Sequence, residues 1–343
     1  MKITLTVVAL CFSLGTGLVA QKPSPTAQSD GTMIESSACP ANPLSTYDLY
    51  VENEKKRNDT EVTAAKTAGF VEPPADFATR LISKDDFERE KGYAGFECRR
   101  ITYMSDGLKV VGFIWKPVNT AGRKLPLIIF NHGGNREFAK LAPWSQFGFY
   151  NYVSNGFVVI GSQYRGIDGG EGKEEFGGAD VDDVMNLIPL ARSLGYVDMN
   201  NVFMLGWSRG AMMTFLALKK GIAVNAAAAG GSPTDIYGDN KRRPAMVKVF
   251  EDLVPDFATK TDERMRERSV IYWPDKINVP LLLLHGGADW RSDPGDALSL
   301  AQKLQSLGKT YELIVYAGDN HAVANNRADR DRRIVEWFKK YIR

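Results

Sequence analysis

The chain has few of the residues that would point to metal binding, and little excess charge. Its 343 residues include three cysteines and three histidines, and 43 basic residues against 41 acidic ones leave a formal net charge of +2. A nucleic-acid or anionic-membrane partner usually requires a strong basic bias, which this composition lacks. The cysteines have no metal-ligand neighbourhood, so a cysteine-based zinc site is not expected. The composition is that of an ordinary soluble globular protein, with 44% hydrophobic residues.

Long apolar runs are also scarce, and the clearest one lies at the N-terminus. Lys2 precedes an apolar run from Ile3 to Leu18, and the small residue Ala20 offers a cleavage site before Gln21. These features predict a signal peptide over residues 1–20 and export to the periplasm or the medium. The run is too short and too interrupted by glycine for a transmembrane helix, so no stable membrane insertion is expected.

Removal of that segment would take Cys11 with it and leave Cys39 and Cys98. In an exported protein these two could form a disulfide that ties the N-terminal extension to the first strands. Two unrelated thiols are the alternative, and the sequence leaves both open.

The rest of the chain divides into an N-terminal extension and a larger domain. Residues 21–45, rich in Pro, Ser, Thr and Gln, predict a flexible leader, and residues 46–70 predict a helix that ends near Gly69. We therefore expect a leader and helical extension over 21–95 and a domain over 96–343.

Within that domain, short apolar runs alternate with helical segments. A hairpin is expected around Ser105-Asp106-Gly107, and buried strands are expected at 127–130, 157–160, 202–205, 226–229, 281–284 and 313–315. Helices are expected at 142–155, 179–194, 209–220, 295–307 and 328–342, with a kink at Pro189. The alternation predicts an α/β fold with a doubly wound, mostly parallel sheet. The long connection at 230–280 predicts a helical cap insertion or, alternatively, a helical excursion without a role.

The most informative motif is Gly206-Trp207-Ser208-Arg209-Gly210, which lies between a predicted strand and a predicted helix. A G-x-S-x-G in this setting is the nucleophile elbow, a tight turn that lifts the serine hydroxyl above the sheet. Glycines are required on both sides because a Cβ would crowd the turn.

Chain order selects the partners of this serine. A serine needs an imidazole to take its proton and a carboxylate to orient that imidazole, in the order Ser, Asp or Glu, His. The order selects Ser208, Asp289 and His321 and leaves His285 at the end of a strand, before the acid. Other carboxylates near the predicted acid and base are alternatives that fit less well: Asp293, Asp296 and Asp319.

The oxyanion of such a reaction needs donors that already point toward it. One is expected to be the backbone N–H of Arg209, and the second is expected from the loop that contains Gly134 and Asn135. His132, in the same loop, is either a residue that orders the loop or itself a donor to the oxyanion.

From about residue 97 onward the chain resembles the catalytic domain of the prolyl oligopeptidase family of serine peptidases and its esterase-like relatives. The blocks that carry the resemblance are Asn131–Gly134, Tyr164–Gly166, Glu174–Asp183, Gly206–Gly210, Leu284–Arg291 and Asn320-His321. The resemblance implies an α/β-hydrolase fold and places nucleophile, acid and base on Ser208, Asp289 and His321.

Two departures from the family pattern bear on the substrate. About 75 residues lie between Gln21 and Phe96, too few for the β-propeller that usually precedes this domain, and His132 stands where many members have a tyrosine.

The sequence thus predicts a serine hydrolase that cleaves a peptide or acyl bond through an acyl-enzyme on Ser208. Hydrolysis of small carboxylic esters is the first alternative, and a non-catalytic binding module of the same fold is the second. The expected partner is a small peptide or ester, and the chemistry needs neither a cofactor nor a metal ion. The sequence leaves the oligomeric state open.

Overall fold

The structure is a computed structural model that describes residues 28–67 and 81–343. The predicted signal peptide, the predicted end of the first helix near Gly69 and the start of the leader lie outside these residues. Among the helices described, none combines the length and the hydrophobicity that a membrane span requires.

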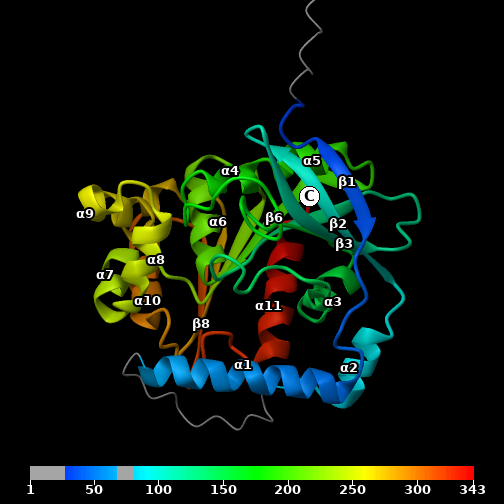
Figure 1. Cartoon of the computed structure of the whole chain (residues 1–343), viewed down its shortest axis with the longest axis horizontal. Helices are drawn as coiled ribbons and strands as arrows, with labels where there is room; N and C mark the ends of the chain where they lie inside the picture. The colour runs from blue at the N-terminus through cyan, green and yellow to red at the C-terminus, as the bar shows by residue number, and fades with distance from the viewer. Residues whose placement is uncertain (1–27, 68–80) are drawn as a thin grey trace, which may run out of the picture.

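A nine-stranded sheet in the order β1-β2-β3-β5-β4-β6-β7-β8-β9 forms the centre of the fold (Figure 1). Its strands are β1 (Met33–Ala38), β2 (Phe96–Ser105), β3 (Leu108–Pro117), β4 (Leu125–Asn131), β5 (Val158–Ser162), β6 (Val197–Trp207), β7 (Ala226–Gly230), β8 (Leu281–Gly286) and β9 (Tyr311–Tyr316). Pairings from β1 to β5 through β2 and β3 are antiparallel, and those from β5 through β4 to β9 are parallel. The predicted doubly wound sheet, entered through an antiparallel hairpin, is confirmed.

Helices cover both faces of this sheet. They are α1 (Tyr47–Thr67), α2 (Lys84–Lys91), α3 (Gln146–Ser154), α4 (Asp180–Met185), α5 (Leu187–Ser193), α6 (Arg209–Lys219), α7 (Ile236–Arg242), α8 (Ala245–Leu253), α9 (Phe257–Glu267), α10 (Pro294–Ser306) and α11 (Arg327–Lys340), with short 3₁₀ turns η2 (Pro143–Ser145), η3 (Val270–Tyr272) and η4 (Pro274–Lys276).

Strand residues alternate between two hydrophobic layers, as the pleat of a strand requires. Leu127 and Ile129 of β4 join the layer packed by α4, α5, α6 and α10, whereas Ile128 and Phe130 face α3 and α11. Because both faces are covered, the strands are continuous apolar runs, and this is why they could be predicted from the sequence.

The helix predicted to kink at Pro189 is instead two short helices that meet at Asn186. Proline lacks the N–H that would bond back to residue 185. In the third position of α5 that N–H is not needed, because the first N–H groups of a helix have no partner within it. The interruption therefore falls one turn earlier than predicted.

The prediction that residues 21–45 form a flexible leader is wrong for residues 33–38. These residues form β1, which pairs antiparallel with β2 at the edge of the sheet. The composition of the segment suggested a leader, but the backbone gains hydrogen bonds by pairing with an exposed strand edge, with one irregularity between Met33 and Glu35.

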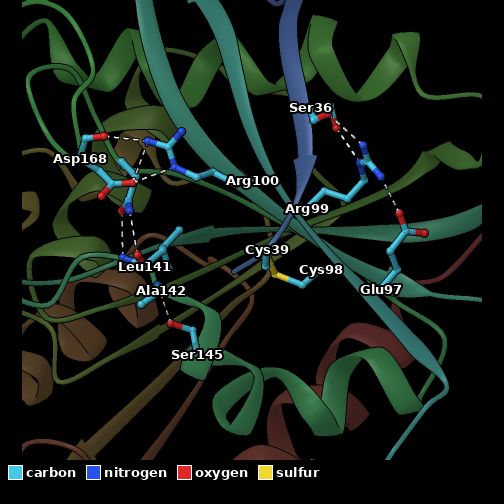
Figure 2. The surroundings of a disulfide bond; sticks show 11 residues. Ser36, Cys39, Glu97, Cys98, Arg99, Arg100, Leu141, Ala142, Ser145 and Asp168 are labelled. Carbon is cyan, nitrogen blue, oxygen red and sulfur yellow. Dashed lines mark hydrogen bonds and ion pairs between the residues drawn. A yellow bond between two sulfur atoms is a disulfide. The ribbon is translucent and has the colours of Figure 1, made fainter. Parts of the chain in front are cut away.

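A disulfide between Cys39 and Cys98 closes the connection between β1 and β2, which settles the alternative left open by the sequence. Figure 2 shows that bond beside Arg99, whose side chain donates to the hydroxyl and carbonyl oxygens of Ser36 at 2.6 and 3.0 Å. The covalent bond and these contacts hold the N-terminal strand on the sheet.

The first two helices pack on the domain through a small aromatic cluster. Phe87 of α2 is fully buried, and its ring stacks on Phe147 of α3 at 5.0 Å and lies 5.4 Å from Tyr50 of α1. As a result, α1 crosses the side of the molecule at which α11 begins (Figure 1).

The connection between β7 and β8 contains α7, α8 and α9, in agreement with the helical insertion expected at 230–280. Its role as a substrate cap stays a prediction.

Candidate active site

Ser208 occupies a sharp turn between β6 and α6. Its backbone has φ 57° and ψ −127°, and its N–H donates to the carbonyl of Gly230 at 2.8 Å. Such a conformation is unfavourable for a residue with a side chain and is found where the surrounding structure enforces it. Ser208 is half-buried, so part of the residue is open to solvent.

The flanking glycines are required by the packing of this turn. A Cβ on Gly210 would lie 1.8 Å from the carbonyl oxygen of Asn131, and one on Gly206 would lie 2.1 Å from the carbonyl oxygen of Gly210. Both distances are far shorter than atoms tolerate, in agreement with the steric argument made from the sequence.

Asp289 and His321 form a buried hydrogen-bonded pair. The carboxylate oxygen Oδ2 of Asp289 lies 2.7 Å from Nδ1 of His321, and the other oxygen, Oδ1, accepts the backbone N–H groups of Arg291 and Ser292 at 2.8 and 3.1 Å. A carboxylate at Nδ1 selects the tautomer in which Nε2 is free to accept a proton.

A second histidine approaches the same carboxylate. Nε2 of His285 lies 3.1 Å from Oδ2 of Asp289 and 2.9 Å from the carbonyl oxygen of Ser292. Burial alone would raise the pKa of Asp289, but the charges and hydrogen bonds of His321 and His285 outweigh it and hold that pKa well below its usual range. The acid is therefore ionised at neutral pH.

Two contacts bring the histidine loop to the serine turn. The indole N–H of Trp207, the residue before Ser208, donates to the carbonyl oxygen of His321 at 2.9 Å. Gly231, which follows the carbonyl that binds Ser208, lies against the His321 ring, where a Cβ would be 3.0 Å from Nδ1 and Cε1. Ser208, Asp289 and His321 thus all lie beyond the carboxyl ends of parallel strands, β6, β8 and β9 respectively.

The alternative carboxylates have other partners. Asp293 caps α10 by accepting the N–H of Gly295, and Asp296 is paired with Arg242. Asp319 accepts the backbone N–H groups of Asn320, Asn325 and Asn326 and so shapes the loop that presents His321.

The loop that follows β4, which we call the glycine loop (residues 132–136), lies beside the serine. A Cβ on Gly133 would be 3.1 Å from Cβ of Ser208 and 3.7 Å from its hydroxyl oxygen. Gly134, with φ +72°, instead faces Phe138, and its carbonyl oxygen accepts from the Arg209 guanidinium. The sequence analysis named Gly134 as a candidate oxyanion donor, whereas the structure places its neighbour Gly133 against the serine. The pair of glycines indicated a close approach in this loop but not which of the two makes it.

His132 is buried, and both of its ring nitrogens face main-chain carbonyl oxygens, Gly133 at 2.8 Å and Gln163 at 3.3 Å. Its ring also stacks on Tyr164 at 4.4 Å. Burial and the nearby charge of Arg209 lower the pKa of His132 to about 4, so the ring is neutral at neutral pH. These contacts favour the loop-ordering alternative over a direct donor to the oxyanion.

No group of three or more His, Cys, Asp or Glu side chains within residues 28–67 and 81–343 is arranged to hold a metal ion.

The parallel sheet, the helices on both faces and the serine turn at a strand end define an α/β-hydrolase. More specifically, the model of the prolyl oligopeptidase family matches residues 143–343, and the chain belongs to that family. It is therefore a hydrolase related to serine peptidases. The matched stretch contains Ser208, Asp289 and His321.

Similar proteins differ widely in how much of their length this chain covers. It is 27% identical to the uncharacterized peptidase YtmA of Bacillus subtilis over 241 residues, which span 70% of this chain and 92% of that protein. It is 24% identical to acylamino-acid-releasing enzyme 1 of Oryza sativa, covering 70% of this chain but 33% of that enzyme. The acylaminoacyl peptidase of Pyrococcus horikoshii superposes with a TM-score of 0.63 at 22% identity, over 76% of this chain and 44% of that one.

Proposed function

We propose that this protein cleaves a short peptide substrate through an acyl-enzyme on Ser208. The observation that carries the proposal is the 2.7 Å contact between Asp289 and Nδ1 of His321 beside the serine turn. That contact prepares Nε2 to take the hydroxyl proton as Ser208 attacks the scissile carbonyl. The same imidazolium then protonates the leaving amine, and water repeats the sequence to release the acyl product.

Negative charge develops on the carbonyl oxygen during both steps. The backbone N–H of Arg209 and an N–H of the glycine loop would stabilise it, because both segments border Ser208. Of the two glycines in this loop, Gly133 lies against the serine, and this contact supports a second donor at that end of the loop.

A peptide substrate is supported by the relatives, whose names describe peptidases or, for the plant enzyme, the release of acylamino acids. The chain spans only about a third of the plant enzyme, so its own specificity is part of the proposal. Ester hydrolysis would use the same groups with a better leaving group, and the test below separates the two substrate classes.

We also propose that the protein is exported. The Cys39–Cys98 disulfide supports this location, because such bonds persist in oxidising compartments.

The nucleophile can be tested with a fluorophosphonate label. The wild-type protein should label at Ser208, and Ser208→Ala should abolish both labelling and turnover. Equal labelling of the two proteins would overturn the assignment. Comparison of kcat/KM on aminoacyl p-nitroanilides and p-nitrophenyl acyl esters then decides the substrate class, since turnover of esters alone would contradict a peptidase.

A further inference from the structure

The side chain of Arg209 turns back from the nucleophile turn toward the glycine loop. It is 3% exposed, and its Nη1 donates to the carbonyl oxygen of Gly134 at 3.1 Å. The same guanidinium pairs with the buried carboxylates of Glu174 and Asp180, the latter at 2.5 Å. One residue thus contributes its backbone to the serine turn and its side chain to the loop opposite.

Glu174 extends this contact to a second point of the loop. One of its oxygens pairs with Arg209, and the other accepts the backbone N–H of Arg136 at 2.5 Å. The glycine loop is therefore held at the carbonyl of Gly134 and, two residues on, at the N–H of Arg136. Asp180 is oriented in turn by the N–H groups of Gly177 and Gly178.

Two aromatic side chains lie close to the guanidinium, and the hydroxyl of one of them also binds the start of the loop. The Arg209 guanidinium lies 5.0 Å from the ring centre of Tyr164 and 4.7 Å from that of Phe176. The Tyr164 hydroxyl donates to the carbonyl oxygen of His132 at 3.0 Å. The loop is thus fixed on both sides of Gly133, the residue that lies against Ser208.

Stability alone does not account for this arrangement. Burying a guanidinium and two carboxylates carries a large desolvation cost, and well-packed apolar residues often serve stability equally well. An oxyanion site has a different requirement, because its donors must be in place before charge develops. A rigid guanidinium fork that spans the two segments bordering the serine meets that requirement.

We propose that Arg209 and Glu174 are positioning residues that hold the glycine loop at a fixed position beside the Ser208 turn. The N–H donors that these two segments contribute to the oxyanion site then stay aligned. This role rests on the proposed function of Ser208. Arg209 contributes its N–H to the oxyanion directly, whereas Glu174 acts only through Arg209 and Arg136.

The test uses Arg209→Lys and Glu174→Gln in the full chain, with Arg165→Lys as the matched control. Arg165 is also a buried arginine paired with carboxylates, Asp183 and Asp106, but none of its hydrogen bonds reaches the glycine loop. Lysine keeps the positive charge but lacks the planar set of hydrogen-bond donors of a guanidinium. A purely electrostatic or structural role therefore predicts similar effects of the substitution at Arg209 and at Arg165. Glu174→Gln preserves volume and serves if Arg209→Lys does not fold.

Rates are normalised to the number of fluorophosphonate-titrated sites, which removes unfolded protein from the comparison. We expect Arg209→Lys to lower kcat by about 10- to 100-fold with little change in KM, as misplacement by about 1 Å does. Affinity for a boronic acid that mimics the tetrahedral state should fall in parallel. We expect a smaller loss in Glu174→Gln, which keeps an acceptor for the Arg136 N–H, and no such loss in Arg165→Lys.

Amide hydrogen exchange gives a readout that does not depend on catalysis. Exchange over residues 132–138 should be faster in Arg209→Lys and Glu174→Gln than in the control. Unchanged exchange there, or an equal loss of kcat in Arg165→Lys, would overturn the positioning role. Failure of the proposed function appears separately, as turnover that persists in Ser208→Ala.

Discussion

Replacement of Asp289 by asparagine is the sharpest perturbation that the site offers. The two side chains are nearly identical in shape, but only one oxygen remains to accept hydrogen bonds. Oδ1 of Asp289 receives the backbone N–H groups of Arg291 and Ser292, and those donors cannot turn away. The asparagine carbonyl must therefore take the Oδ1 position, which leaves its NH₂ group facing Nδ1 of His321.

An NH₂ at this position reverses the tautomer of the imidazole. Nδ1 of His321 would have to accept, so the ring proton would move to Nε2, the atom that should receive the serine proton. Where this reversal occurs in a serine protease triad, kcat falls by about 10⁴-fold with the geometry intact. We expect a loss of about 10³- to 10⁴-fold here, which corresponds to about 4–5.5 kcal/mol of transition-state stabilisation.

The assay is kcat on whichever chromogenic substrate the wild-type protein turns over, with unfolding curves for each variant. Asp293→Asn is the matched control, because Asp293 caps α10 and asparagine caps a helix equally well. It should keep wild-type activity. Because Asp293 also pairs with Arg242 at 2.9 Å near the surface, the variant should lose no more than about 1 kcal/mol of stability. A loss of less than about tenfold in Asp289→Asn, or a similar loss in both variants, would refute the assigned role of the acid.

Three further predictions concern Gly231 beside the serine turn, the buried acid Glu90 and the disulfide. Gly231→Ala should lower kcat far more than Gly107→Ala. Both glycines have positive φ, but of the two only Gly231 lies where the new methyl would meet the ring of His321, the proposed base, and equal activity would contradict that packing. Burial raises the pKa of Glu90 from 4.5 to about 7 against the opposing charges of nearby arginines, so folding stability should fall as pH rises from about 4.5 to 7 while only the unfolded chain ionises. Glu90→Gln should remove that dependence and gain about 1–3 kcal/mol at pH 8 but little at pH 4, as measured by denaturant unfolding. Replacement of Cys39 and Cys98 by serine, which opens a loop closed across 59 residues, should lower stability by about 2–4 kcal/mol, and wild-type protein in reductant should match the variant.

Much of the architecture was open to prediction because the central strands are buried on both faces. That burial demands continuous apolar runs such as 127–130 and 281–284, which stand out against the helical periodicity around them. The edge strand β1 escaped prediction because its residues are mostly polar and exposed, and its conformation comes from pairing with β2 rather than from its own residues.

The sequence by itself selected the residues of the candidate site. The order Ser208, Asp289, His321 and the glycines around the serine follow from local sterics and from the chain order of this fold. Its balanced charge also led us to expect no nucleic-acid partner, and that expectation stays a prediction.

Only the tertiary structure decided which of several equivalent residues lie together. Gly133 and Gly134 are the same residue type in adjacent positions, and which one faces the serine depends on how β4 and the β6 turn approach each other. The side chain of Arg209 meets Glu174 and Gly134, 35 and 75 residues earlier in the chain. No local pattern encodes contacts between segments so far apart, because they form only when the strands that carry them are aligned in one sheet.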